Sequence, residues 1–246
     1  MRPIIGVPLR YSHLEDGRAI LYIGERIRRT LQNAGGEVFS LTPVQDVDYV
    51  DTKGNEFPKL TEAEKRIINK NLDKCDGLFL PGGTKFTPYD RYILEYAIEK
   101  KIPTLAVCLS MQMMSCYQED VKLEKNDTNI NHRQQSDYEF SHKVLIDRNS
   151  RLYDILQKEE ISVNSFHNYH GTNNCIYNTV AKSEDGLIEG LEYPGDFFNI
   201  GVQWHPEISY DFDENSRKII NAFIEQSKIR QELILNESKK EINILK

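Results

Sequence analysis

The chain has 246 residues, and 38 acidic against 31 basic side chains leave a formal net charge of −7. This acidic balance argues against general binding to nucleic acids or anionic membranes, since phosphate neutralisation needs clustered Lys and Arg. No apolar run approaches the roughly 20 residues that span a bilayer, and the first residues carry no secretory signal. The four cysteines form no CxxC pair and no Cys/His metal spacing, so we expect a reducing, cytoplasmic setting.

The first half of the chain alternates short apolar runs with helical patterns. Strands are predicted over residues 4–7, 38–41, 77–80 and 104–107. Helices are predicted over residues 20–34, 61–72, 90–100 and 111–117. The second of these opens with Thr61 three residues before Glu64, which is a capping-box pattern. Because the strands are apolar throughout, this rhythm predicts an α/β fold with a mostly parallel central sheet and helices on both faces.

The second half of the chain is less regular. We expect a loop over residues 121–131, followed by shorter strands that pair partly antiparallel, at residues 143–146, 160–163, 179–181, 186–192 and 198–202. A helix is predicted from Asp213, and the pattern leaves open whether residues 229–246 continue it or form a loose tail. No repeat or linker is visible, so we expect one domain over residues 1–228 with a C-terminal helical extension or tail.

A strand that runs directly into Cys108 and then into a helix is the first chemical signal. A nucleophile at such a turn projects above the carboxyl edge of the sheet, where ligands of α/β proteins bind. The helix that follows directs its positive end at the sulfur and favours the reactive thiolate. A lone cysteine is as readily a small core residue, so the interpretation depends on partners.

The partners are predicted about a hundred residues downstream. His205 and Glu207 follow the apolar run 198–202, which places them at the same edge of the sheet. The carboxylate of Glu207 can hold the imidazole of His205 in the productive tautomer and stabilise its protonated form. Cys108, His205 and Glu207 are therefore the predicted catalytic residues, although a packed histidine and a solvated glutamate are the plainer interpretations.

Several stretches together resemble the γ-glutamyl-γ-aminobutyrate hydrolase family of class I glutamine amidotransferase-like cysteine hydrolases. The resemblance runs from residue 2 to about residue 225 and is carried by RPIIGV at 2–7, AGG at 34–36, LPGG at 80–83, VCLSMQ at 107–112, HRQ at 132–134, SHKV at 141–144, VNSFH at 163–167 and GVQWHPE at 201–207. It implies a flavodoxin-like α/β fold and hydrolysis of a γ-glutamyl amide through a γ-glutamyl thioester. It also implies that no metal and no organic cofactor is needed.

The resemblance assigns further roles around the nucleophile. The backbone N–H groups of Gly83 and Leu109 are the expected oxyanion-hole donors, since glycine allows close approach of the main chain. The expected substrate-binding residues are Gly82, Gln112, His132, Arg133, Gln134 and His167. Arg133 is a candidate for the substrate α-carboxylate because its guanidinium fits a carboxylate in two places.

Three positions depart from the family pattern. Ala106 and Ser110 stand where the family usually has Gly, which enlarges the residues around Cys108. Leu109 stands where the hydrolases usually have Arg and the amidotransferases commonly have Leu. The first two departures motivate a third interpretation besides the two enzymes, a catalytically weakened relative that binds or regulates.

These interpretations differ in their partners. A hydrolase needs only its small γ-glutamyl substrate, whereas a glutaminase subunit would supply ammonia to a partner synthetase. Neither nucleic acid nor membrane is an expected partner, and the sequence leaves a homodimer open. Activity is expected to fall on the acid side as His205 takes up a proton.

Overall fold

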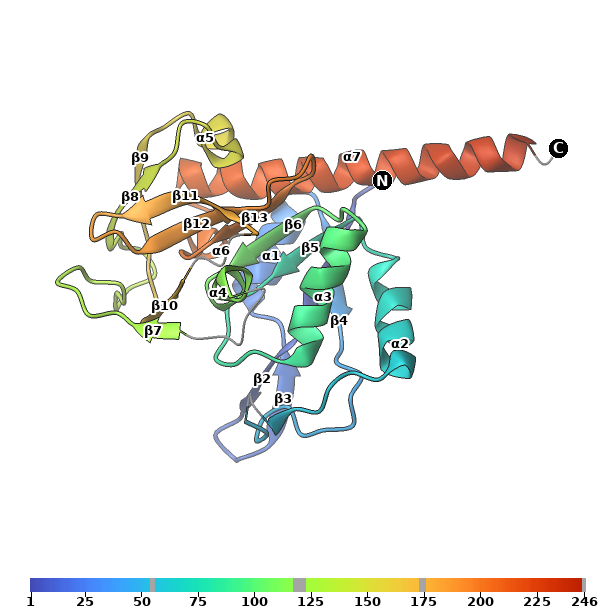
Figure 1. Ribbon diagram of the computed structural model, residues 1–246, viewed down its shortest axis with the longest axis horizontal. Helices are drawn as coiled ribbons and strands as arrows, with labels where there is room; N and C mark the ends of the chain where they lie inside the picture. Colours follow the sequence, from blue (N-terminus) through green and yellow to red (C-terminus); the bar gives the residue numbers. More distant parts are fainter. Residues whose placement is uncertain (54–55, 117–122, 173–175, 245–246) are drawn as a thin grey trace.

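The computed structural model of the protein describes residues 1–53, 56–116, 123–172 and 176–244. Within these ranges, a nine-stranded sheet in the order β4-β1-β5-β6-β13-β12-β11-β8-β9 forms the centre of the molecule (Figure 1). The first five strands are mutually parallel: β4 (Glu37–Leu41), β1 (Ile4–Pro8), β5 (Gly77–Leu80), β6 (Thr104–Val107) and β13 (Asn199–Val202). The last four continue antiparallel: β12 (Ile188–Glu192), β11 (Asn178–Ser183), β8 (His142–Ile146) and β9 (Glu160–Val163).

Helices cover both faces of this sheet. One face packs against α1 (Glu25–Asn33), α5 (Arg151–Leu156) and α7 (Glu214–Ile244). The other packs against α2 (Glu62–Leu72), α3 (Pro88–Glu99) and α4 (Leu109–Ser115). Alternate residues of each strand therefore enter opposite cores, as period-2 side-chain alternation requires. The predicted α/β class, with its parallel sheet and its antiparallel portion, is confirmed.

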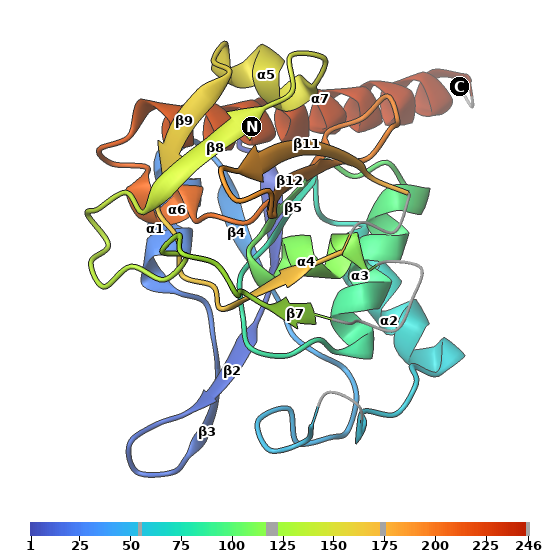
Figure 2. The ribbon, with the colours of Figure 1, turned by 60° about the vertical axis from the view of Figure 1, so that its left-hand side comes forward.

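The predicted helix over residues 20–34 is wrong at its start. Residues 10–22 form a hairpin of β2 (Arg10–His13) and β3 (Ala19–Tyr22), and the helix begins only at Glu25. Gly17, with φ 83°, sits in the hairpin turn, where a left-handed conformation favours glycine. The hairpin projects from the body of the molecule beyond the carboxyl end of β1 (Figures 1 and 2).

Several short elements were not predicted. A two-stranded ribbon pairs β7 (Leu123–Lys125), inside the expected loop, with β10 (Tyr169–Gly171). The short helix α6 (Pro206–Ser209) directly follows β13. At the other extreme, α7 runs without a break to Ile244 and extends beyond the body (Figure 1). None of the helices in the described ranges is both long and apolar enough to cross a membrane.

Candidate active site

Cys108 sits at the sharp turn between β6 and α4. Its backbone has φ 52° and ψ −109°, a conformation that is strained for a residue with a side chain. Two hydrogen bonds hold it there: its N–H donates to the carbonyl of Val202 on β13, and its carbonyl accepts from the N–H of Gln112, each over 2.9 Å. The turn places the side chain at the carboxyl edge of the sheet, where 9% of the residue is exposed.

His205 and Glu207 approach Cys108 from the neighbouring strand. His205 follows β13, the partner of β6, and its Nδ1 lies 2.8 Å from Oε1 of Glu207. The ring of His205 also lies beside Cys108, because both side chains approach the same point at Gly82. A Cβ on Gly82 would lie 3.1 Å from Cε1 of His205 and 3.3 Å from Cβ of Cys108, so the backbone of the loop after β5 also reaches this point. The three predicted catalytic side chains are thus brought together.

The surroundings of His205 favour its protonated form. Burial alone would lower its pKa, but the negative charges of Glu207 and Cys108, with their hydrogen bonds, hold the pKa well above its usual value. The protonated form of His205 is therefore preferred before reaction. Once the sulfur is acylated it no longer carries a negative charge, so the proton of His205 is released more readily.

Asn164, at the end of β9, was not singled out from the sequence although it lies in the VNSFH stretch. Its Oδ1 accepts from the backbone N–H of His205, and its Nδ2 donates to the carbonyl of His205, each over 2.8 Å. Phe166 packs edge-on against the imidazole with ring centroids 5.6 Å apart. Together these contacts fix the backbone and the ring plane of His205.

Arg10 on β2 was also missed, and it organises the loop around Gly82. Its guanidinium donates to the carbonyls of Pro81 and Gly82 over 2.6 and 2.8 Å, and pairs with Asp90 over 2.6 Å. In a planar trans peptide the N–H points away from the preceding carbonyl. Because Arg10 holds the carbonyl of Gly82, the N–H of Gly83 is directed away from Arg10.

Ser110 joins the same network. Its hydroxyl donates to the carbonyl of Pro81 over 2.8 Å and accepts from Arg10 over 3.0 Å. A glycine at this position, as the family usually has, would supply neither bond. The departure from the family pattern therefore provides a direct contact between the helix after Cys108 and the loop that carries Gly82 and Gly83.

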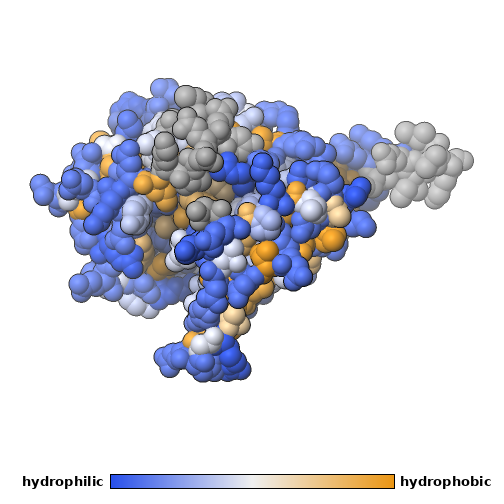
Figure 3. Space-filling model, turned by 60° about the horizontal axis from the view of Figure 1, so that its bottom comes forward, coloured by the Kyte–Doolittle hydropathy of each residue, from blue (hydrophilic) through white to orange (hydrophobic). Residues whose placement is uncertain are grey.

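A cavity of about 350 Å³ opens beside His205. Gly82, His205 and Glu207 line one side, and residues 22–27 line the other, including Arg26. This volume is in the range of small-molecule sites. Figure 3 shows the face of the molecule that points down in Figure 1. This face is mostly hydrophilic, and apolar side chains gather around a hollow near its middle.

The other predicted substrate-binding residues lie elsewhere or are engaged. Gln112 is buried, and its Nε2 donates to the carbonyl of Tyr169 over 2.6 Å and to Gln203 over 3.1 Å. Arg133 is exposed and donates to the carbonyl of Phe166. Gln134 is buried and bonds to the backbone of residues 136, 139 and 165. Their substrate contacts stay a prediction.

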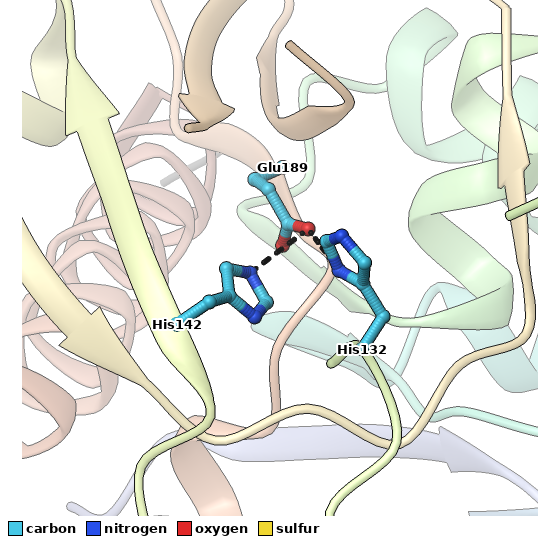
Figure 4. Close-up of side chains that lie close together, drawn as sticks. All are labelled: His132, His142 and Glu189. Carbon is cyan, nitrogen blue, oxygen red and sulfur yellow. Dashed lines mark ion pairs between the residues drawn. The ribbon is translucent and has the colours of Figure 1, made fainter. Parts of the chain in front are cut away.

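His132 and His167 lie in a buried cluster with His142 and Glu189. Figure 4 shows three of these side chains, His132, His142 and Glu189. The Oε1 atom of Glu189 is 3.4 Å from Nδ1 of His132, 3.2 Å from Nε2 of His142 and 3.4 Å from Nε2 of His167. Both His132 and His167 also border a separate cavity of about 190 Å³, which Arg133 lines as well. The cluster is the place in the described residues with the donor atoms for a metal ion.

Two other cysteines lie in the described ranges. Cys75 is fully buried, and burial raises the pKa of its thiol to about 12. Cys116 is also buried. Cys175 lies outside the described residues.

Known proteins resemble this chain in sequence. The family model for Peptidase C26 matches residues 88–207. The γ-glutamyl-γ-aminobutyrate hydrolase PuuD of Escherichia coli K12 is 25% identical over 257 aligned positions, which cover 90% of this chain and 92% of PuuD. The chain is therefore similar to a γ-glutamyl-γ-aminobutyrate hydrolase over most of its length. These similarities indicate an activity of the γ-glutamyl hydrolase or glutamine amidotransferase type.

Solved structures show the same fold. The glutaminase domain of Trypanosoma brucei CTPS with bound acivicin has a TM-score of 0.61 at 17% identity, covering 94% of each chain. A glutamine amidotransferase from Thermotoga maritima has a TM-score of 0.55 at 17% identity, covering all of this chain and 94% of that one. The fold is therefore class I glutamine amidotransferase-like, as the motifs imply.

Proposed function

We propose that the protein is a cysteine-dependent hydrolase that cleaves the γ-glutamyl amide bond of a small γ-glutamyl compound. The observation that carries the proposal is the contact of His205 with both Cys108 and Glu207 beside a cavity at the carboxyl edge of the sheet. A nucleophile, a base within hydrogen-bond reach and a carboxylate that orients the base are the parts that acyl transfer through cysteine requires.

Acylation uses the ion pair. The Cys108 thiolate attacks the γ-carbonyl carbon, and the backbone N–H groups of Gly83 and Leu109 stabilise the oxyanion. His205 then gives its proton to the departing amine as the C–N bond breaks, which leaves a γ-glutamyl thioester on Cys108. Arg10 and Ser110 support this step by holding the carbonyls of Pro81 and Gly82 on the side of the loop opposite to the N–H of Gly83.

Deacylation uses the same imidazole as a base. With the sulfur acylated, His205 loses one of the two negative neighbours that raise its pKa, so it can take a proton from water. The hydroxide attacks the thioester carbonyl, glutamate leaves and the thiolate returns. Arg26, on the wall of this cavity and paired with Asp137 over 2.8 Å, is the candidate for the substrate α-carboxylate, whereas Arg133 lines the other cavity.

A glutaminase subunit that supplies ammonia to a synthetase is the second candidate. Leu109, in place of the Arg usual in the hydrolases, favours it, as does the fold shared with the Trypanosoma brucei glutaminase domain. The chemistry at Cys108 would be the same, but turnover would need L-glutamine and a partner protein.

The test is glutamate release by the purified chain alone from a panel of γ-glutamyl amides and L-glutamine. We expect release from at least one γ-glutamyl amide other than glutamine, with an acyl adduct on Cys108 detected by mass spectrometry after acid quenching. Turnover of L-glutamine only when a partner synthetase is added would instead establish the glutaminase. A chain that is inert toward the whole panel, with Cys108 unreactive to iodoacetamide at neutral pH, would identify a binding relative.

A further inference from the structure

The cluster of His132, His142, His167 and Glu189 has no role in the proposed chemistry. Its side chains come from four separate places: the loop before β8, β8 itself, the segment after β9, and β12. Glu189 and His142 are almost wholly buried, with 0% and 1% of their side chains exposed. Both carboxylate oxygens of Glu189 and both ring nitrogens of His142 lack a hydrogen-bond partner among the described residues. Buried polar atoms without partners are costly, so this arrangement needs an explanation.

The outer contact of His132 fixes which of its nitrogens faces Glu189. Nε2 of His132 lies 2.9 Å from Oδ2 of Asp185, a carboxylate oxygen that can only accept, so Nε2 carries the proton. In the neutral imidazole of His132 the opposite nitrogen, Nδ1, therefore directs its lone pair at the carboxylate of Glu189. Nδ1 of His167 lies 2.9 Å from the carbonyl oxygen of Tyr169 and 3.3 Å from Nδ2 of Asn126, so it has both an acceptor and a donor within reach.

Lone pairs on nitrogen and oxygen that face one another repel unless a cation lies between them. The distances from Oε1 of Glu189 to the three nitrogens are 3.2–3.4 Å. Ligand atoms that bind Zn²⁺ tetrahedrally at about 2.0–2.1 Å lie about 3.3–3.4 Å from one another. The separation in the cluster is therefore that of atoms sharing a metal ion. The ligand atoms of His132, His142 and Glu189 also lie within 4.8 Å of one another.

We propose that this cluster is a structural site for a divalent transition-metal ion, with Zn²⁺ as the best chemical fit. His132, His142 and Glu189 are the core ligands, and His167 completes a four-coordinate set. Neutral imidazole nitrogen with one carboxylate is a donor set that Zn²⁺ takes readily, and a site closed by four protein ligands is typical of structural zinc. The contact of His132 with Asp185 is the outer hydrogen bond that metal-binding histidines usually make.

The cavity of about 190 Å³ gives the ion a route to the site. His132 and His167 form part of its wall, and the other lining residues, from the segments 125–133 and 167–168, include the cationic Lys125 and Arg133. An ion bound at the cluster would connect four segments that are distant in sequence. The ligands are spread over the sequence from residue 132 to residue 189, so they form no short metal-binding motif.

The first test measures metal in the full-length protein after purification from zinc-supplemented medium. Elemental analysis is expected to find about one zinc per chain, as a single tetrahedral site requires. In the metal-stripped protein, added Zn²⁺ should raise the Tm, because an ion that binds only the folded state stabilises it. Adding Co²⁺ instead should give the strong visible absorption of a tetrahedral site.

Variants make the assignment specific. His142→Ala and Glu189→Gln should lose the bound zinc, and Asp185→Asn, which keeps all the ligands, should weaken zinc affinity about 10- to 100-fold. His13→Ala is the matched control, because His13 is an exposed histidine on the separate β2–β3 hairpin. Asp185→Asn also keeps the test valid if the ligand variants fail to fold.

Two results would overturn the proposal. The first is wild-type protein that contains almost no zinc and whose Tm does not rise when Zn²⁺ is added. In that case protons on the histidines, rather than a metal ion, would lie between their nitrogens and Glu189. Equal zinc loss from His13→Ala and Asp185→Asn would mean adventitious surface binding.

Discussion

Two glutamates in this molecule stand beside histidine and are built for different tasks. Glu207 meets one imidazole, that of His205, which also contacts Cys108 and borders a cavity. Glu189 shares one oxygen with three imidazoles and is wholly buried. A glutamate beside a histidine is therefore not by itself a catalytic pair. Such a pair can act in catalysis only if the second nitrogen of the imidazole is free to pass a proton to a reacting group.

The largest expected effect is that of Cys108→Ala. Without the sulfur no thioester forms, and glutamate release should fall by about 10⁴-fold or more, as for other nucleophile deletions. Steady-state turnover on the best γ-glutamyl substrate measures it. Cys75→Ala is the control, since that thiol is fully buried and its pKa is raised to about 12. Residual activity above a hundredth of wild type would remove Cys108 as the nucleophile.

Glu207→Gln tests the glutamate that we propose to be catalytic. An amide cannot stabilise the imidazolium of His205, so kcat should fall about 10²- to 10⁴-fold. Urea unfolding monitored by fluorescence should show a smaller change than in Glu189→Gln, because Glu207 pairs with one imidazole and Glu189 with three. If the loss is mainly in stability, Glu207 is structural and the distinction between the two glutamates fails.

Glu189→Gln is the matched substitution in the cluster, and its effect should be the reverse. Removing one charge from a buried ionic group typically costs about 3–5 kcal/mol of unfolding free energy. Turnover per folded molecule should change far less than in Glu207→Gln, because Glu189 touches no group in the proposed reaction. Parallel unfolding and single-turnover measurements on the two variants give the contrast directly.

Arg10→Lys should produce an intermediate effect on catalysis. Lysine keeps the charge but cannot donate at once to Pro81, Gly82 and Asp90. The oxyanion loop then loses its fixed orientation, and kcat should fall about 10- to 100-fold while KM changes little. Arg18→Lys, at an exposed pair with Asp16, is the control. A change confined to KM would place Arg10 in substrate binding instead.

The smallest expected effect is a displacement of the pH profile. The pKa of His205 is raised, so its imidazole should stay protonated, as acylation requires, to a pH well above the usual histidine range. Deacylation needs the neutral imidazole and should slow on the acid side. In Glu207→Gln the alkaline midpoint of the acylation burst should move down, since one raising influence is gone. Unchanged midpoints would mean that Glu207 does not act on the imidazole.

Much of the parallel half could be predicted from sequence because its signals are local. The apolar strands, the capping box at Thr61 and the strand–Cys108–helix pattern each depend on neighbouring residues. The projecting hairpin was missed because the spacing of Ile20 fits a strand as well as a helix. The meeting of His205 with Cys108 was predicted from strand-end placement, and the roles of the three residues stay a prediction.

Long-range polar contacts could not be predicted in the same way. Arg10 reaches carbonyls 71 and 72 residues away, and Asn164 binds a backbone 41 residues away. Nothing in the spacing of His132, His142, His167 and Glu189 shows that they converge. Such contacts depend on which strands lie side by side, and the order of β13, β12, β11 and β8 is set by the whole sheet.

One short segment serves both regions. Asn164 clamps His205, and His167, three residues later, belongs to the histidine cluster. A change that displaces His167 from the cluster would therefore also displace Asn164, which lies three residues earlier and holds the backbone of His205. On gradual heating, we expect activity to be lost before most of the helical signal, because the segment 164–167 should lose its structure before the surrounding sheet does.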